Sequence, residues 1–373
     1  MNFVAPCIFG LEGLVSDELK NMGAENVLAE NGRVLFSGDE HILARANICS
    51  RFSERILILL GRFKARTFTE LFDNVKTLPL EEYIGKKDAF PVKGWSLNSA
   101  LHSIPDCQKI IKKAAVERLK SVYHESWFEE TGKRLQLQFS ILKDDVMVML
   151  ETSGEGLHKR GYRAASNISP IKETLAAAMA QIARIYSDSV VIDPFCGSGT
   201  ILIESAMIAN NIAPGLKRHF ACEDYGFVDD YIFKQERERA IGEIKMADGF
   251  HAFGYDIDDN SLKIAQNNAR LAGVDKFITF DNRDIRDFDA SGDKGLVITN
   301  PPYGERLLDI RQAEELYRIM GERFISKPRW KYYVITSSER FEELFGRSAD
   351  KRRKLYNGSL KCQLYMYFRV KMD

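Results

Sequence analysis

Short apolar runs alternate with amphipathic stretches through the second half of the chain. Runs of β-branched and aromatic residues bounded by polar residues predict buried strands, at 190–192, 252–255, 277–280, 296–298 and 332–336. Between them, apolar residues at helical spacing predict helices, at 175–182, 201–210, 261–272 and 311–325. Two further strands, 353–356 and 364–370, flank the turn at Asn357-Gly358. This alternation is typical of an open, largely parallel sheet covered by helices.

The first half has a different pattern, in which strands and helices occur in an irregular order. The predicted elements are a strand at 3–10, a helix at 11–21, a hairpin at 27–36, a strand at 56–62, a helix at 67–75, a strand at 89–98 broken by Gly94, a helix from Ile104 and an antiparallel pair at 135–141 and 146–151. This half is therefore predicted to be an α+β region.

Composition limits the class of protein. At 373 residues, the chain exceeds the usual size of one core, so two or three domains are expected. It has neither a membrane-length apolar run nor a basic N-terminus followed by an apolar stretch, so we predict no membrane span and no signal peptide. The six cysteines are scattered, without a Cys-x-x-Cys or a Cys/His cluster. We therefore expect no metal, no disulfide framework and a reducing, cytoplasmic location.

A glycine-rich turn joins the strand at 190–192 to the helix at 201–210. It reads Asp-Pro-Phe-Cys-Gly-Ser-Gly-Thr from Asp193 to Thr200, and such a turn brings backbone N–H groups against a ligand. It is neither Gly-x-Gly-x-x-Gly nor a nucleotide-triphosphate loop. A sheltered acid at the strand end disfavours phosphate and favours a cation. The turn therefore suits S-adenosylmethionine, which carries an ammonium and a sulfonium but no phosphate.

Two more acids follow the next two predicted strands. Asp256 ends the strand at 252–255, where it can accept hydrogen bonds from both hydroxyls of a ribose. Asp284 follows the strand at 277–280, where it can accept from an adenine amino group while Ile285 packs on the ring. Each acid alone is also what a helix cap or a turn would use. Three in series favour a cofactor site.

Asn300-Pro301-Pro302-Tyr303-Gly304 follows the strand at 296–298. The prolines supply no N–H, so the backbone leaves the sheet stiffly with free carbonyls. An amide oxygen, a free carbonyl and the flat face of Tyr303 together suit a planar substrate that bears an exocyclic amine. The alternative is a strand-ending turn with a buried tyrosine.

Net charge is zero, with 53 Lys and Arg against 53 Asp and Glu, but basic residues are locally concentrated. A basic run is most often a solvated face. Three such runs, two of them beside Tyr162 or Tyr356, also suit a phosphate backbone with splayed bases. The candidate RNA-binding residues are Lys109, Lys112, Lys113, Lys159, Arg160, Arg163, Arg352 and Arg353. Residues 211–250 are polar, and we interpret them as an insertion over the site that is capable of lid behaviour; the alternative is a plain surface excursion.

Together, these motifs resemble a known enzyme family. The pairing of Asp193–Thr200 with Asn300–Tyr303 resembles class I S-adenosylmethionine-dependent methyltransferases that act on exocyclic amines. The segments Ile-Lys-Glu-Thr-Leu-Ala from Ile171 and Asn-Pro-Pro-Tyr-Gly-Glu-Arg-Leu from Asn300 narrow the resemblance to THUMP-containing RNA guanine-N2 methyltransferases, in particular the bacterial group acting on 23S ribosomal RNA. The resemblance covers essentially the whole chain.

The resemblance implies a fold and a set of roles. It implies an α/β, Rossmann-like, seven-stranded methyltransferase domain (166–373), preceded by an α+β ferredoxin-like part (1–60) and a THUMP RNA-binding region with its linker (61–165). Asp193, Gly197 and Gly199 would hold the methionine part of the cofactor, and Thr174 its carboxylate. The full expected cofactor site is Thr174, Asp193, Phe195, Gly197, Gly199, Thr200, Asp256, Ile257, Asp284, Ile285 and Asn300, and the expected catalytic residues are Asn300, Pro301, Pro302 and Tyr303.

Three alternatives stay open. The same Asn-Pro-Pro-Tyr tetrapeptide serves adenine-N6 methylation of DNA or RNA. A tRNA guanine-N2 methyltransferase would carry the same motifs. A non-catalytic RNA-binding ribosome assembly factor that senses the cofactor is the third, although such a protein has no use for amine acceptors beside a sulfonium.

Overall fold

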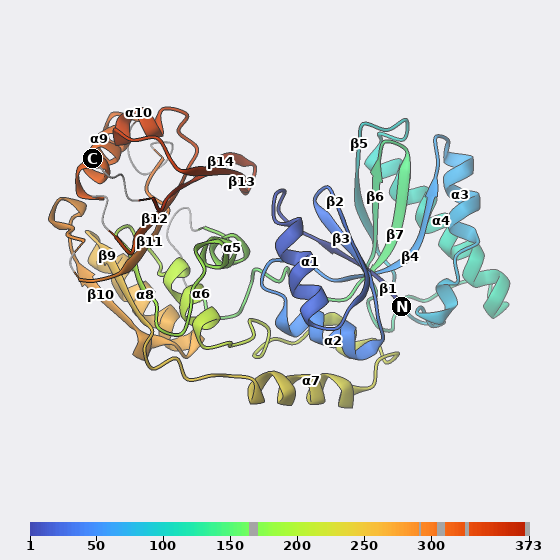
Figure 1. Ribbon diagram of the computed structural model, residues 1–373. Helices are drawn as coiled ribbons and strands as arrows, with labels where there is room; N and C mark the ends of the chain where they lie inside the picture. The colour runs from blue at the N-terminus through green and yellow to red at the C-terminus, as the bar shows by residue number, and fades with distance from the viewer. Residues whose placement is uncertain (164–170, 291, 304–309, 325–327, 370–373) are drawn as a thin grey trace.

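The computed structural model describes residues 1–163, 171–290, 292–303, 310–324 and 328–369. Figure 1 shows two lobes, one coloured blue to green and the other green to red, and each is built around a seven-stranded sheet. No helix in these described ranges is both long enough and apolar enough to span a membrane.

The N-terminal lobe combines the predicted ferredoxin-like and THUMP parts. Its elements are β1 (Asn2–Pro6), α1 (Glu12–Asn21), β2 (Glu25–Glu30), β3 (Arg33–Ser37), α2 (Glu40–Cys49), β4 (Leu57–Lys64), α3 (Phe68–Lys76), β5 (Val92–Leu97), α4 (Ile104–Tyr123), β6 (Leu137–Leu142) and β7 (Asp145–Glu151). The strand order is β2-β3-β1-β4-β7-β6-β5. Because β1 pairs with β4, and β4 with β7, the two predicted parts share one sheet.

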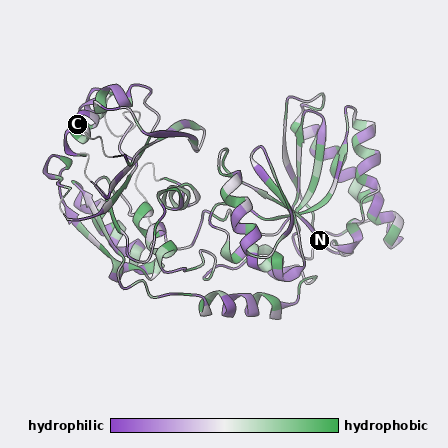
Figure 2. Ribbon diagram, in the orientation of Figure 1, coloured by the Kyte–Doolittle hydropathy of each residue, from purple (hydrophilic) through white to green (hydrophobic). Residues whose placement is uncertain are grey.

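This sheet is strongly curled. Arg33 on β3 donates a hydrogen bond to Ser140 on β6 across 3.4 Å, although three strands separate β3 from β6 in the sheet order. A small apolar cluster that includes Val4 and Met147 is buried on the same face. On the outside, α3 and α4 carry hydrophobic and polar positions side by side, as amphipathic helices do (Figure 2).

Two local predictions in this lobe were incomplete. Helix α2 was missed, although Asp39 caps it by accepting a hydrogen bond from the Ile42 amide. Strand β5 runs unbroken through Gly94, which was expected to interrupt it. A Cβ at Gly94 would lie 2.2 Å from the Phe139 carbonyl oxygen. Glycine therefore lets β5 approach β6 closely and does not break the strand.

The second lobe confirms the predicted α/β fold. Its elements are α5 (Glu173–Ala183), β8 (Val190–Asp193), α6 (Thr200–Ala209), α7 (Asp230–Gly242), β9 (His251–Asp256), α8 (Asp259–Ala272), β10 (Ile278–Asn282), β11 (Gly295–Thr299), α9 (Ile310–Arg323), β12 (Trp330–Thr336), α10 (Phe341–Phe345), β13 (Lys351–Asn357) and β14 (Leu360–Tyr367). The strand order is β10-β9-β8-β11-β12-β14-β13. Strands β8 to β12 are parallel, and β14 pairs antiparallel with both β12 and β13.

The parallel strands end at one edge of the sheet. Strand order reverses between β8 and β11, and open α/β sheets bind their ligands at such a switch point. Helix α5, expected at 175–182, begins at Glu173. The predicted domain boundary at 165/166 lies outside the described residues.

Residues 211–250 connect the two lobes. Helix α7 lies along α2 of the N-terminal lobe, below it in Figure 1, rather than over the glycine-rich turn. Glu236 on α7 is buried and accepts hydrogen bonds from Arg45 on α2 (2.8 Å) and from Arg239 (2.7 Å). Helix α7 therefore does not lie over the site as expected, and a lid role for the rest of this segment stays untested.

Candidate active site

The turn after β8 has the backbone shape of a ligand cradle. Gly197 and Gly199 have φ of +52° and +80°, a region that favours glycine. A Cβ at Gly199 would lie 3.1 Å from the Ala265 Cβ and 3.2 Å from the Phe280 ring. The Gly197 N–H donates to the Asp256 carboxylate at 2.9 Å, which ties the end of β9 to the turn.

Asp193 lies at the end of β8 and is only 1% exposed. It accepts hydrogen bonds from the Thr299 hydroxyl (2.7 Å) and the Phe195 amide (3.1 Å). Burial raises the pKa of this carboxyl to about 7, although both hydrogen bonds lower it. Within the described residues, Asp193 forms no salt bridge. A buried carboxylate without a basic partner suits the ammonium group of a ligand.

The acids after β9 and β10 are both half-buried. Burial raises the pKa of Asp256, which also accepts from the Asp258 amide at 3.0 Å. Asp284 is paired with Arg286 at 2.9 Å. Ile285 is 3% exposed and sits in the hydrophobic core, whereas Ile257 is 71% exposed beside Asp256. The packing of Ile285 on an adenine ring stays a prediction, and Ile257 is the more exposed of the two expected apolar contacts.

Asn300 follows β11 directly, one residue after the Thr299 that bonds Asp193. The Tyr303 hydroxyl donates to the Asn300 side-chain oxygen and lies 3.9 Å from the Cys362 sulfur on β14. Tyr317 donates to the Pro302 carbonyl at 3.1 Å, which fixes the prolyl turn. Gly304 lies outside the described residues. An incoming amine would therefore compete with a phenolic hydroxyl for the Asn300 acceptor.

Comparison with known proteins identifies this arrangement. Family models match three segments in succession, described as an RlmL ferredoxin-like domain (residues 2–57), a THUMP domain (65–151) and an RMKL-like methyltransferase domain (160–366). The chain belongs to the THUMP-containing, S-adenosylmethionine-dependent RNA methyltransferases.

Relatives span the whole chain. YpsC of Bacillus subtilis, named provisionally as an RNA methyltransferase, is 41% identical over 98% of this chain and 95% of its own length. The ribosomal RNA large subunit methyltransferase K/L of Syntrophotalea carbinolica is 31% identical over 98% of this chain. This chain spans about half of that relative, 53% of its length.

Solved structures share the complete fold. A Clostridium difficile 630 protein, described provisionally as a methylase, is 42% identical, with a TM-score of 0.95 over 100% of this chain and 99% of its own. SMU.472, described provisionally as a methyltransferase and solved with SAH, is 41% identical, with a TM-score of 0.92 over 100% and 99%. A Listeria monocytogenes protein, described as a predicted N6-adenine-specific DNA methylase, is 43% identical, with a TM-score of 0.92 over 98% and 96%.

Two expected cofactor residues of the methyltransferase have other partners. Thr174 is fully buried and donates to Glu54 of the N-terminal lobe at 2.7 Å. Thr200 accepts from Arg163 at 2.7 Å. The Thr174 hydroxyl therefore joins the two lobes, whereas Arg163 and Thr200 both lie in the segment matched as the methyltransferase domain. The contact of Thr174 with the cofactor carboxylate stays a prediction. Phe195 is half-buried beside the aromatic core.

The basic run at Lys159–Arg163 is mostly internal. Arg160 and Glu204 form an ion pair at 3.3 Å, with side chains 1% and 0% exposed, and buried Tyr162 donates to Glu204 at 3.0 Å. Arg163 pairs with buried Glu173 at 3.3 Å. The expected RNA contacts of Arg160 and Tyr162 are therefore wrong, because neither side chain reaches the surface. Lys159 is exposed and pairs with Glu155.

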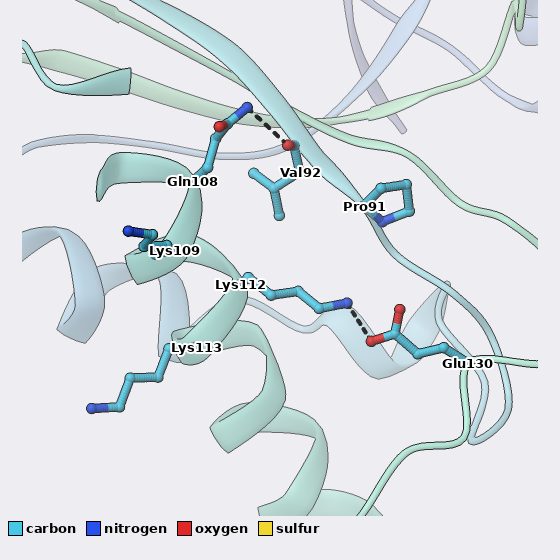
Figure 3. Close-up of a pocket in the computed structure, with 7 residues that line it drawn as sticks. All are labelled: Pro91, Val92, Gln108, Lys109, Lys112, Lys113 and Glu130. Carbon is cyan, nitrogen blue, oxygen red and sulfur yellow. Dashed lines mark hydrogen bonds and ion pairs between the residues drawn. The ribbon is translucent and has the colours of Figure 1, made fainter. Parts of the chain in front are cut away.

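The lysines of α4 line an open depression of about 550 Å³ next to β5 (Figure 3). Lys112 lies 3.3 Å above the Phe90 ring centre and 2.6 Å from Glu130, and burial lowers its pKa. The Lys112 ammonium therefore already has partners within the protein. Lys109 and Lys113 point away from Glu130 and are exposed, so they stay candidates for RNA contact.

The run at 351–354 lies on β13, an edge strand. Arg352 pairs with Glu342, and Arg353 donates to the Gly10 carbonyl of the N-terminal lobe. Both predicted RNA-binding arginines therefore have protein partners. No group of acidic, His and Cys side chains suited to a metal ion occurs in the described parts of the methyltransferase.

Proposed function

We propose that the enzyme transfers a methyl group from S-adenosylmethionine to the exocyclic N2 amine of a guanine in 23S ribosomal RNA. The observation that carries this proposal is the Thr299–Asp193 hydrogen bond. This bond joins Asp193, whose carboxyl suits the cofactor ammonium, to the residue just before Asn300. The Asn300 side chain is the acceptor that suits the substrate amine. The names of the K/L relatives support the choice of ribosomal RNA.

The proposed mechanism relies on acceptor oxygens. S-adenosylmethionine supplies an electrophilic methyl group when bound. A guanine amine is a poor nucleophile because its lone pair is delocalised into the ring. The two N–H groups of the amine would donate hydrogen bonds to the Asn300 side-chain oxygen and the Pro301 carbonyl. These bonds would localise the lone pair on the nitrogen and stabilise the charge that develops there. The Tyr303 ring would stack the flipped base, a contact worth about 1–3 kcal/mol. The methylated amine then loses a proton to water without a strong base.

Cofactor binding is expected to depend on pH through Asp193. Only the carboxylate form of Asp193 pairs with an ammonium. Below about pH 7 the Asp193 carboxyl carries a proton, which must be lost before the cofactor ammonium can pair with it. We expect affinity for S-adenosylmethionine to rise by up to about tenfold per pH unit up to about pH 7 and then to level off. Titration calorimetry at a series of pH values below and above pH 7 measures this affinity.

Asp193→Asn is the matched control for this titration. It keeps the size of the side chain but removes its ionisation, so its weaker affinity should stay flat across the same range. A flat profile for the unsubstituted protein would show that Asp193 does not bind the ammonium.

Methyl transfer to isolated RNAs tests the proposed function. Labelled methyl incorporation into 23S ribosomal RNA and into tRNA, followed by nucleoside mass spectrometry, separates the candidate substrates. N2-methylguanosine in ribosomal RNA supports the proposal. N6-methyladenosine would favour the activity in the name of the Listeria protein, and binding without transfer would favour an assembly factor. A ribosomal RNA substrate would place the enzyme in the cytoplasm.

A further inference from the structure

A small exposed surface lies where the two lobes meet beside the active site. The β13–β14 hairpin projects from the methyltransferase lobe towards the N-terminal lobe (Figure 1). Its tip contacts the loop between β1 and α1, because the Phe9 ring lies 6.1 Å from the Tyr356 ring. We define the junction surface as Phe9, Lys354, Tyr356 and Lys361.

Phe9 is held in place although it is exposed. The ring is 56% exposed, and it lies on the Gly32 backbone, where a Cβ would come within 3.2 Å of it. The two carboxylate oxygens of Glu12 accept from the Gly10 and Gly32 amides, at 2.9 Å each. This clamp fixes the loop on both sides of the ring. A large aromatic ring presented rigidly to solvent is a ready platform for a stacking partner.

The hairpin adds a second ring and two unneutralised charges. Tyr356 pairs with Lys361 across the strands, and Lys354 pairs with Gln363 in the same register, so Lys354, Tyr356 and Lys361 share one face. The Lys354 ammonium lies 5.4 Å from the Tyr356 ring centre. Both lysines are exposed, and neither has an ion-pair partner among the described residues. Unpaired cations beside aromatic rings match the phosphates and bases of an RNA strand.

The hairpin that carries the junction surface also borders the candidate active site. Cys362, next to Lys361, lies 3.9 Å from the Tyr303 hydroxyl. Because neighbouring residues of a strand point to opposite faces, Cys362 faces Tyr303, and Tyr356 and Lys361 lie on the other face of the hairpin. Nucleotides that flank a base at Tyr303 would therefore reach the junction surface by passing around the tip of the hairpin.

We propose that the junction surface binds the single-stranded nucleotides that flank the target base. Phe9 and Tyr356 stack bases, and Lys354 and Lys361 contact phosphates. The proposal rests on the proposed function only in that the substrate is RNA. It assigns to the ferredoxin-like part a direct role beside the active site, through Phe9.

Binding of a fluorescein-labelled, unstructured oligouridine to the full chain tests this assignment by fluorescence anisotropy. Phe9→Ala and Tyr356→Ala are each expected to weaken binding by about tenfold, the loss typical of one stacked base. Lys354→Ala and Lys361→Ala should each reduce the salt dependence, by about 0.7 in the slope of log K against log salt. Phe9→Leu and Tyr356→Leu keep apolar bulk without an aromatic plane and should weaken binding similarly.

Matched controls lie on α7. Tyr231 is 58% exposed and Lys234 is also exposed, and neither adjoins the active site. Tyr231→Ala and Lys234→Ala should bind oligouridine as the unsubstituted protein does. Affinity for S-adenosylmethionine should be unchanged in all variants, which shows that they are folded.

Three results would overturn the proposal. These are no oligouridine binding by the unsubstituted protein, equal losses in the α7 controls, or junction variants that alter self-association in sedimentation and leave RNA binding unchanged. If binding follows the expected pattern while no RNA is methylated, the junction surface stands and the proposed function fails. If guanine is methylated but the junction variants keep a normal KM for RNA, the proposed function stands and the role of the junction surface fails.

Discussion

Asn300→Ala is expected to reduce turnover by roughly 10²–10³-fold while leaving cofactor affinity unchanged. The amide oxygen is aimed where charge develops on the amine nitrogen, and removal of one such contact typically costs that much. Asp193 and the glycine turn do not depend on this side chain, since Thr299 donates to Asp193 and the Gly197 amide donates to Asp256. Single-turnover methyl transfer, with calorimetry for the cofactor, measures both quantities.

Tyr303→Phe is the matched control for that prediction. It keeps the ring for stacking and removes the hydroxyl that occupies the Asn300 oxygen. We expect it to retain most of the turnover, because the acceptor is left free for the amine. Methylation that survives Asn300→Ala intact would refute the proposed mechanism.

Glu204→Gln is expected to destabilise the fold by roughly 3–5 kcal/mol. It keeps the shape of the side chain but leaves Arg160 as a buried cation without its carboxylate, and breaking one side of such a pair typically costs this much. Arg160 retains hydrogen bonds to the Leu157 and Arg51 carbonyls, which is why the loss should not exceed this range. Urea titration followed by circular dichroism measures the change.

Lys159→Ala supplies the comparison from the same basic run. Its pair with Glu155 is exposed, and such pairs are worth about 0–1 kcal/mol. A loss below about 1 kcal/mol for Glu204→Gln, similar to that of Lys159→Ala, would show that the carbonyl oxygens alone satisfy Arg160.

The sequence was most informative where local pattern decides structure. Strand ends, the glycine turn and the position of Asn300 follow from short segments, and the structure places Asp193, Asp256 and Asn300 at one edge of the sheet as expected. Their roles in binding and catalysis stay predictions. The sequence could not show which of Ile257 and Ile285 is exposed, because both follow an acid and only the packing of the folded chain distinguishes them.

The sequence was less informative where distant residues decide the environment. Arg160 sits in a run that looks like a basic surface, and its burial depends on Glu204, which lies on α6. Thr174 begins a helix near the cofactor turn, yet its partner Glu54 comes from the other lobe. Neither pairing leaves a periodic signal in the sequence. The position of α7 likewise depends on ion pairs between Glu236 and the N-terminal lobe.

The continuous sheet of the N-terminal lobe restricts how the enzyme can bend. Strand β1 belongs to the ferredoxin-like part and β4 leads into the THUMP domain, and backbone hydrogen bonds join them. Independent swivelling of these two parts would break those bonds, so they move as one rigid arm. We therefore expect the two candidate RNA-binding surfaces of this lobe, at Phe9 and at Lys109, to keep a fixed spacing, which an RNA that touches both would have to match.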